Sequence, residues 1–267
     1  MYFLSVVLIG TVYPIFLDVI SAKKISVGPP FYHKLILPFL VPFLLFMAFG
    51  PKLKWIKSKI ENKRSLTIFL IISLILTFFL LKNLNTNLFF YTILISTAFF
   101  LFFTTLKELL FKKFNNISQA VAHFGFSLFI LSILFNGILS SEITTNIKVG
   151  ERYKHNEEEI FFEKIEEKKE SNFNSIIGYF IITNVKGEVV KLNPEIRVYN
   201  QPIMITSEAD IQTTLLKDKF LVMSVVKGND YFNIRYQVKP FMLWIWISVL
   251  LLSLGGLMSL FKRKYEK

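Results

Sequence analysis

The stretch ISQAVAHFGFSLFILSILFNG, residues 117–137, decides the class of fold. It is an apolar run long enough to cross a hydrocarbon layer as a helix, since about 20 such residues suffice. It also contains His123, one of only three histidines in the chain. Ionisable side chains are costly in lipid and are usually functional there, so His123 is a candidate site residue.

Similar apolar runs recur along the chain, which has 267 residues, 53% of them hydrophobic, and 30 Phe. The predicted spans are 2–20, 35–50, 65–81, 88–106, 117–139 and 240–261. We therefore predict a polytopic α-helical membrane protein with about six spans and one external β-rich module, a small barrel or sandwich. The predicted domains are a five-span membrane region 1–139, the external domain 140–239, and a final span with its tail 240–267.

The positive charges indicate a topology rather than a nucleic-acid partner. The net charge is +12, but the loops 51–64, 107–116 and 262–267 together hold 13 Lys and Arg. Segment 140–239 holds 14 Lys and Arg against 15 Asp and Glu. Basic loops favour the cytoplasmic or matrix side, so segment 140–239 is expected outside. The chain has no cysteine, which excludes disulfides and thiolate metal sites of its own.

The external segment carries strand and turn signals. Two pairs of apolar runs flank Lys186–Gly187 and the sequence KGND at 227–230, and both pairs predict hairpins. The charged stretch 151–170 is interpreted as a solvated surface segment. Pro240 is expected in the first turn of the last helix. Trp244 and Trp246 are expected near the outer membrane interface.

Two interpretations of His123 stay open at this stage. At 1.5 Å per residue it lies about 9–10 Å into the bilayer, too deep for a short side chain to reach the surface easily. Ala120 and Ser127 share its face, leaving room for a flat, bulky group, and a neutral imidazole is a good iron ligand. A histidine that hydrogen-bonds to a neighbouring helix is the equally favoured alternative.

The other ionisable candidates have simpler explanations. His33 is assigned to an outer loop and His155 to an exposed position. Asp18 and Glu108 fall near the ends of predicted spans, which indicates interfacial positions. No soluble-enzyme motif is present, so no catalytic residue is assigned.

Four segments, in order along the chain, carry a family resemblance. They are GTVYPIFLDVISAKKISVGPPFYHKLILPFLVPFLLFMAFGP at 10–51, AVAHFGFSLFIL at 120–131, LNPEIRVYNQPIMITSEADIQ at 192–212 and KPFMLWIWISVLLLSLGGLMSL at 239–260. They resemble the large haem-lyase subunit of cytochrome c maturation, the CcmF/NrfE family. Because the segments span nearly the whole chain, the resemblance is specific.

The resemblance implies attachment of haem to the CxxCH cysteines of apocytochrome c. In that family a haem chaperone delivers haem, the substrate, to a tryptophan-rich motif flanked by two outer histidines. A second, b-type haem lies in the membrane between two transmembrane histidines. The implied partners are the haem chaperone, apocytochrome c, and proteins that reduce its thiols or present it. The implied location is the bacterial inner membrane or the mitochondrial inner membrane.

Only part of that machinery matches this chain. His123 matches the second transmembrane histidine, the axial ligand of the b-type haem. The three tryptophans Trp55, Trp244 and Trp246 form no tryptophan-rich motif, and the remaining histidine ligands belong to the family's N-terminal half. The chain resembles the C-terminal half alone, which a split gene or a truncated gene model would explain. A partner chain is expected to bring the other half, and no metal is expected besides haem iron.

The remaining residues that match the family's signature are Gly28, Pro29, Pro30, Pro194, Glu195, Arg197, Tyr199, Thr206, Glu208, Ala209, Trp244 and Trp246. For those in the external module, folding of the module itself is the alternative to partner binding. The whole chain has two alternatives. One is a non-catalytic scaffold in which His123 is only structural. The other is a haem exporter, which is disfavoured because no repeats or paired broken helices are found.

Overall fold

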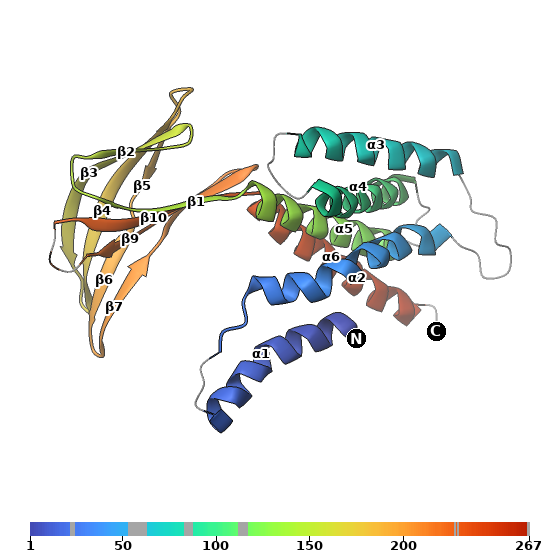
Figure 1. Cartoon of the computed structure of the whole chain (residues 1–267), viewed down its shortest axis with the longest axis horizontal. Helices are drawn as coiled ribbons and strands as arrows, with labels where there is room; N and C mark the ends of the chain where they lie inside the picture. The colour runs from blue at the N-terminus through green and yellow to red at the C-terminus, as the bar shows by residue number, and fades with distance from the viewer. Residues whose placement is uncertain are drawn as a thin grey trace. The chain divides into compact units, whose positions relative to one another are not determined.

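The computed structural model describes residues 1–21, 25–52, 63–82, 88–111, 117–226, 228 and 230–265 (Figure 1). Within these ranges the helices are α1 (Tyr2–Ser21), α2 (Pro29–Phe49), the short 3-10 helix η1 (Gly50–Lys52), α3 (Lys63–Leu81), α4 (Leu88–Phe111), α5 (Ile117–Leu139) and α6 (Met242–Tyr265). Six of them are long and apolar enough to cross a membrane, which confirms the predicted class. Trp55 lies outside the described residues.

Several predicted helix ends need correction. Helix α2 begins at Pro29 rather than at residue 35, so the segment taken for an outer loop is partly helical. Gly28 is its N-cap residue, and prolines suit the first helical positions because their missing amide would be unpaired there. Helix α4 continues to Phe111, five residues beyond the predicted end. As a result, Glu108 is part of that helix.

Small and hydroxyl-bearing side chains let the membrane helices approach one another. Ser96 of α4 donates a hydrogen bond to Thr77 of α3 at 3.1 Å, and both residues are buried. Gly10 of α1 lies against the ring of Tyr32 in α2. Such contacts are typical of helix packing in lipid, where close backbone approach replaces the hydrophobic effect.

The chain divides into two compact units, residues 1–131 with 251–267 and residues 132–250. The second unit contains the strands β1 (Ser141–Ile147), β2 (Arg152–His155), β3 (Glu158–Lys169), β4 (Phe173–Asn184), β5 (Val189–Leu192), β6 (Glu195–Asn200), β7 (Ile203–Glu208), β8 (Asp210–Thr213), β9 (Lys217–Val225) and β10 (Phe232–Pro240). They form a four-stranded sheet in the order β1-β10-β9-β8 and a second sheet in the order β2-β3-β4-β6-β7, with β5 paired to β4. The strands of the described module pair antiparallel, and its two sheets make it a sandwich, one of the two predicted forms.

The core of the sandwich lies between the inward faces of the two sheets. The rings of Phe162 on β3 and Phe180 on β4 stack with centroids 4.1 Å apart. Leu221, Met223 and Ile234 contribute from the other sheet. Alternate residues of each strand thus point into the core, as expected for two packed sheets.

Two predictions for this module need correction. The charged stretch 151–170 is not only a solvated surface segment: it forms β2 and all of β3, and although most of its residues are exposed, Ile160 and Phe162 are fully buried. The many charged residues hide the strand pattern, in which every second side chain points into the core. Pro240 is not in the last helix but ends β10, paired with Lys217, and α6 begins at Met242. Phe241, with a φ of 59°, makes the sharp change of direction between them.

Candidate functional site

Different faces of helix α5 contact three other helices, α4, α2 and α6. The hydroxyl of Ser127 lies 2.7 Å from that of Thr105 in α4, both buried. The ring of Phe126 meets that of Phe43 in α2, with centroids 5.9 Å apart. On another side, Ala122 lies against Gly255 of α6. The helix that carries His123 is therefore held at several points.

His123 lies between two of these contact sides. At 3.6 residues per turn, Ser127 lies about 40° to one side of it and Phe126 about 60° to the other. The imidazole is half-buried, and its Nδ1 atom is shielded from solvent. On the helix it therefore lies between the sides that contact α2 and α4.

A second ionisable group lies on the neighbouring helix. Glu108 follows Thr105 by three residues on α4, and His123 precedes Ser127 by four residues on α5. Both are therefore about one turn from the Thr105–Ser127 hydrogen bond. The Oε2 atom of Glu108 is buried against the protein, and the interfacial position of this residue stays a prediction. The sequence could have indicated Glu108, because this carboxylate follows Thr104 and Thr105 by about one turn in an apolar helix.

The small residues that were predicted to leave room for haem are used in helix packing. Ala120 and Ser127 are both fully buried, and Ser127 bonds to Thr105 as well as to the carbonyl of Phe124. Their contribution to a haem-binding face stays a prediction. His33 is exposed in the first turns of α2, and His155 at the end of β2 hydrogen-bonds with Asn156. The three histidines therefore lie in different elements and surroundings.

Four signature residues of the external module lie on one outward face of β6 and β7: Glu195, Arg197, Thr206 and Glu208. The register pairs Arg197 with Thr206 and Glu195 with Glu208. Arg197 donates from Nε to Glu195 at 2.9 Å, and Thr206 donates to Glu208 at 2.9 Å. The bond to Glu195 is also the main reason that the pKa of Arg197 is raised.

The other signature residues of the module have local roles. Tyr199 packs against Phe173. Pro194 is buried and accepts a hydrogen bond from the Gly178 amide at 3.0 Å, while Ala209 is exposed. Glu195, Arg197 and Tyr199 are two residues apart along β6, so they lie on the same face of the strand.

Trp244 and Trp246 differ in their surroundings. The indole of Trp244 donates to the carbonyl of Leu215, in the turn between β8 and β9, at 2.8 Å. Trp246 is exposed, and its position at the outer membrane interface stays a prediction.

A buried ion pair joins the two sheets, and sequence reasoning missed it. Glu158, at the start of β3, accepts hydrogen bonds from Tyr236 of β10 at 2.5 Å and from Lys219 of β9 at 2.9 Å. The side chains of Glu158 and Lys219 are only 12% and 7% exposed. Burial opposes ionisation of Glu158, but these two donors outweigh it and lower its pKa. Burial and the carboxylate raise the pKa of Tyr236, so this hydroxyl stays protonated.

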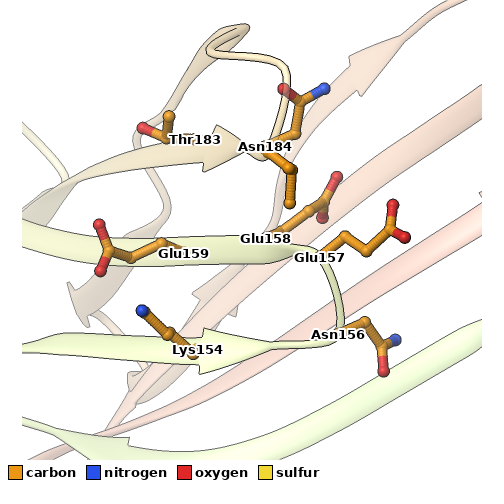
Figure 2. A pocket seen from close by; sticks show the side chains of 8 residues that line it. Lys154, Asn156, Glu157, Glu158, Glu159, Thr183 and Asn184 are labelled. Atoms are coloured by element: carbon orange, nitrogen blue, oxygen red, sulfur yellow. The ribbon is translucent and has the colours of Figure 1, made fainter.

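A cavity of about 320 Å³ opens beside this pair (Figure 2). Its lining residues are Lys154, Asn156, Glu157, Glu158, Glu159, Thr183, Asn184 and Val185. In Figure 2, Glu158 and Glu159 leave β3 in different directions, as neighbours on a strand do. The Glu158 carboxylate thus points to Lys219 between the sheets, while Glu159 pairs with the exposed Arg152.

The comparisons with known proteins agree with this architecture. Residues 138–240 match the family model described as "CcmF C-terminal beta-sandwich". Over 98% of its length the chain is 26% identical to the cytochrome c-type biogenesis protein CcmF of Pseudomonas fluorescens and 27% identical to that of Escherichia coli K12. Over nearly its whole length the chain is thus similar to the C-terminal half of CcmF. This confirms the resemblance carried by the four segments.

The chain covers only 42% of the length of each of these two CcmF relatives. The same share holds for the cytochrome c-type biogenesis protein NrfE of Haemophilus influenzae, which is 26% identical. A solved structure of "Cytochrome c Heme Lyase CcmF" matches with a TM-score of 0.71 at 20% identity. That match covers 96% of this chain and 43% of the other, so it supports the fold of the whole chain.

The contact between Gly255 and Ala122 gives a first prediction. A Cβ atom at Gly255 would lie 2.6 Å from the Ala122 amide nitrogen, whereas one at Gly256 would meet nothing within 4 Å. We expect Gly255→Ala to destabilise the helical unit by about 1–3 kcal/mol, the usual cost of overpacking. Gly256→Ala is the matched control, because both changes raise helix propensity equally. Thermal unfolding of the purified chain in detergent measures the difference, and equal midpoints would contradict the contact.

Proposed function

We propose that this chain is the C-terminal part of a cytochrome c haem lyase. In this function, haem delivered by a haem chaperone is joined through thioether bonds to the CxxCH cysteines of apocytochrome c. The observation that carries the proposal is the co-linear similarity to CcmF over 98% of the chain, which includes the helix with His123 and the complete sandwich. The reaction needs haem and both thiols held in one orientation more than it needs acid–base side chains.

The role that we propose for His123 is axial ligation of a b-type haem within the membrane. The residue fits that role, because imidazole is a common iron ligand and its Nδ1 atom is shielded inside the protein. A ligating histidine usually directs one ring nitrogen to the protein and the other to the metal. The second axial histidine would come from the N-terminal part of the haem lyase. When bound, such a haem supplies an electron-transfer centre.

The surroundings of His123 would fix its ring. The Thr105–Ser127 hydrogen bond and the close approach of Ala122 to Gly255 hold α5 against its neighbours on either side of the histidine. The buried oxygen of Glu108 is about one turn from the same hydrogen bond. We propose that these contacts limit the rotation of α5, so that the imidazole keeps one direction.

The sandwich would act as a scaffold on the outer side of the membrane. Basic loops favour the inner side, so the balanced segment 140–239 is assigned to the periplasm or intermembrane space. The membrane would be the bacterial inner membrane or the mitochondrial inner membrane. We propose that the outward face of β6 and β7, with Arg197, Thr206 and Glu208, docks proteins that present or reduce apocytochrome c. The hydrogen bonds along that face keep its charged groups at fixed positions.

A non-catalytic scaffold is the second candidate. The observation that favours it is the presence of two shielded polar atoms, His123 Nδ1 and Glu108 Oε2, on helices that already share a hydrogen bond. Polar side chains of this kind often serve helix–helix contacts alone. In that case His123 would hold α5 in place without binding iron.

The proposed activity is tested by reconstitution in cells that lack their own haem lyase. The full chain is produced together with the N-terminal part of the lyase, the haem chaperone and a reporter apocytochrome. We expect covalent haem on the reporter, seen by haem staining of denaturing gels, only when both parts of the lyase are present. A folded complex that leaves the reporter without covalent haem would contradict the proposal and favour the scaffold.

A further inference from the structure

The turn between β8 and β9 exposes two large apolar side chains. Leu215 is 69% exposed and Leu216 is 65% exposed. Turn residues of soluble domains are mostly Gly, Pro, Asn, Asp and Ser, so adjacent leucines at such a tip are unusual. Single exposed apolar residues are common, but neighbouring ones mark an interaction site.

Two hydrogen bonds hold this tip at the start of α6. The indole Nε1 of Trp244 donates to the carbonyl of Leu215 at 2.8 Å, and the amide of Phe241 donates to the carbonyl of Leu216 at 2.8 Å. Both leucine carbonyls are therefore used inward, while both leucine side chains face outward. The tip cannot move far from the first turn of α6 without breaking these bonds.

The first turn of α6 fixes the depth of the tip. Residues Met242–Phe261 form a segment long and apolar enough to cross a membrane, and Trp244 lies within its first turn. A tryptophan in that position is typical of the boundary between headgroups and acyl chains. Leu215, which is bonded to that ring, must lie at nearly the same level.

Two lysines lie beside the tip and are held against the sandwich. Lys217 follows the leucines; its backbone pairs with Pro240, and its ammonium lies 3.8 Å from the carboxylate of Glu158. Lys239, next to Pro240 in the sequence, has its ammonium 5.5 Å from the ring of Phe220. The pairing of Lys217 with Pro240 therefore keeps the tip beside the residues that lead into α6.

We propose that the β8–β9 tip, residues 214–216, inserts Leu215 and Leu216 into lipid in the leaflet where α6 begins. The occupant of this apolar tip is lipid, at the boundary between headgroups and acyl chains. The contact adds a second anchor beside α6. It restricts rotation of the sandwich about its connection to that helix. The inference does not depend on haem or on the proposed activity.

The absence of cysteine from the chain makes the test direct. Leu215→Cys and, separately, Leu216→Cys each give a single site for a nitroxide spin label. The full chain, with its N-terminal part where both are needed for folding, is placed in lipid nanodiscs. Spin relaxation then compares collisions with oxygen, which concentrates in lipid, and with a water-soluble nickel chelate. We expect both labels to collide more with oxygen and to be at least about tenfold shielded from nickel relative to an aqueous site.

Val225→Cys is the matched control for both variants. Val225 is also an exposed apolar residue, and it ends the strand that begins just after Leu216. At about 3.3 Å per residue it lies about 30 Å along β9 from the tip. We expect its label to prefer nickel. Equal gel-filtration profiles and equal thermal unfolding show that the labelled proteins share one fold.

Two results would overturn the inference. Labels at 215 and 216 that collide with nickel as readily as the label at 225 would put the tip in water. Labels shielded from both oxygen and nickel would put the tip under another protein segment. Because the two leucines are substituted separately, a folding defect in one variant leaves the other to decide.

Discussion

Replacing His123 by alanine is expected to remove the b-type haem spectrum from the complex of this chain with its N-terminal part. The substitution removes the proposed iron ligand directly. We therefore expect a loss of haem affinity at least as large as the about 10–100-fold loss that outer-sphere changes cause at metal sites. The measurement is the reduced-minus-oxidised visible spectrum of the purified complex, with haem content determined as the pyridine haemochrome.

The other two histidines are the controls for this substitution. His33 is exposed on α2, and His155 bonds to its neighbour Asn156 on the sandwich. We expect His33→Ala and His155→Ala to keep the full haem content. If His123→Ala keeps it as well, in a complex that contains haem, the ligand assignment is wrong and His123 is structural.

A conservative change at the same position separates ligation from packing. Methionine can also ligate haem iron, and His/Met ligation raises the reduction potential relative to His/His. His123→Met is therefore expected to retain haem with an altered visible spectrum and a higher midpoint potential. A histidine that only bridges helices would leave the potential of any bound haem unchanged.

The helices could be predicted from sequence because a span needs a long apolar run and little else. The predicted ends were less accurate, for reasons of local chemistry. Helix α2 starts at Pro29 because Gly28 and the two prolines suit a helix start, although the run there is less apolar. In α4 the sequence LKELL, with two charges, suggested a loop, yet the helix continues through Glu108. Hydropathy indicates whether a segment lies in lipid or in water, but it does not indicate the residue at which the helix ends.

The sandwich and the site show the limit of local patterns more clearly. The hairpins around Gly187 and Gly228 could be predicted because positive φ at glycine is a local property. The stretch 151–170 was misinterpreted because its many charges hide the inward residues Ile160 and Phe162. The assignment of His123 as an iron ligand, from its depth and from the family resemblance, stays a prediction. The surroundings of this residue, such as Thr105 on α4, depend on which helices meet, and no local signal carries that information.

The pair formed by Glu158 and Lys219 is the clearest such case, because its partners are 61 residues apart in the sequence and lie on different sheets. We expect Glu158→Gln to destabilise the sandwich by about 3–5 kcal/mol, the usual cost of removing one partner of a buried ion pair. The cost arises because Lys219 keeps its charge in a site that is 7% exposed, without the carboxylate that balanced it.

Glu159→Gln is the matched control, since Glu159 is the next residue on β3 and pairs with the exposed Arg152. Exposed pairs contribute at most about 1 kcal/mol. Hydrogen–deuterium exchange of β9 and β10 peptides in the intact chain measures the difference. Protection in these strands should fall by about 10²–10⁴-fold in the Glu158 variant, the equivalent of about 3–5 kcal/mol, and little in the control. Equal protection in the two variants would mean that the pair adds nothing to the fold.

The pH dependence of the stability difference between wild type and Glu158→Gln tests whether the charged carboxylate causes that difference. Buried Glu158 has a lowered pKa because hydrogen bonds from Tyr236 and Lys219 outweigh desolvation. A lowered pKa gives stability that is complete above the ordinary value of 4.5 and is lost as the pH falls through the folded value. The difference between wild type and Glu158→Gln should therefore be largest near neutral pH and shrink in acid. A difference that stays constant as the pH falls from 7 to well below 4.5 would point to altered packing instead of lost charge.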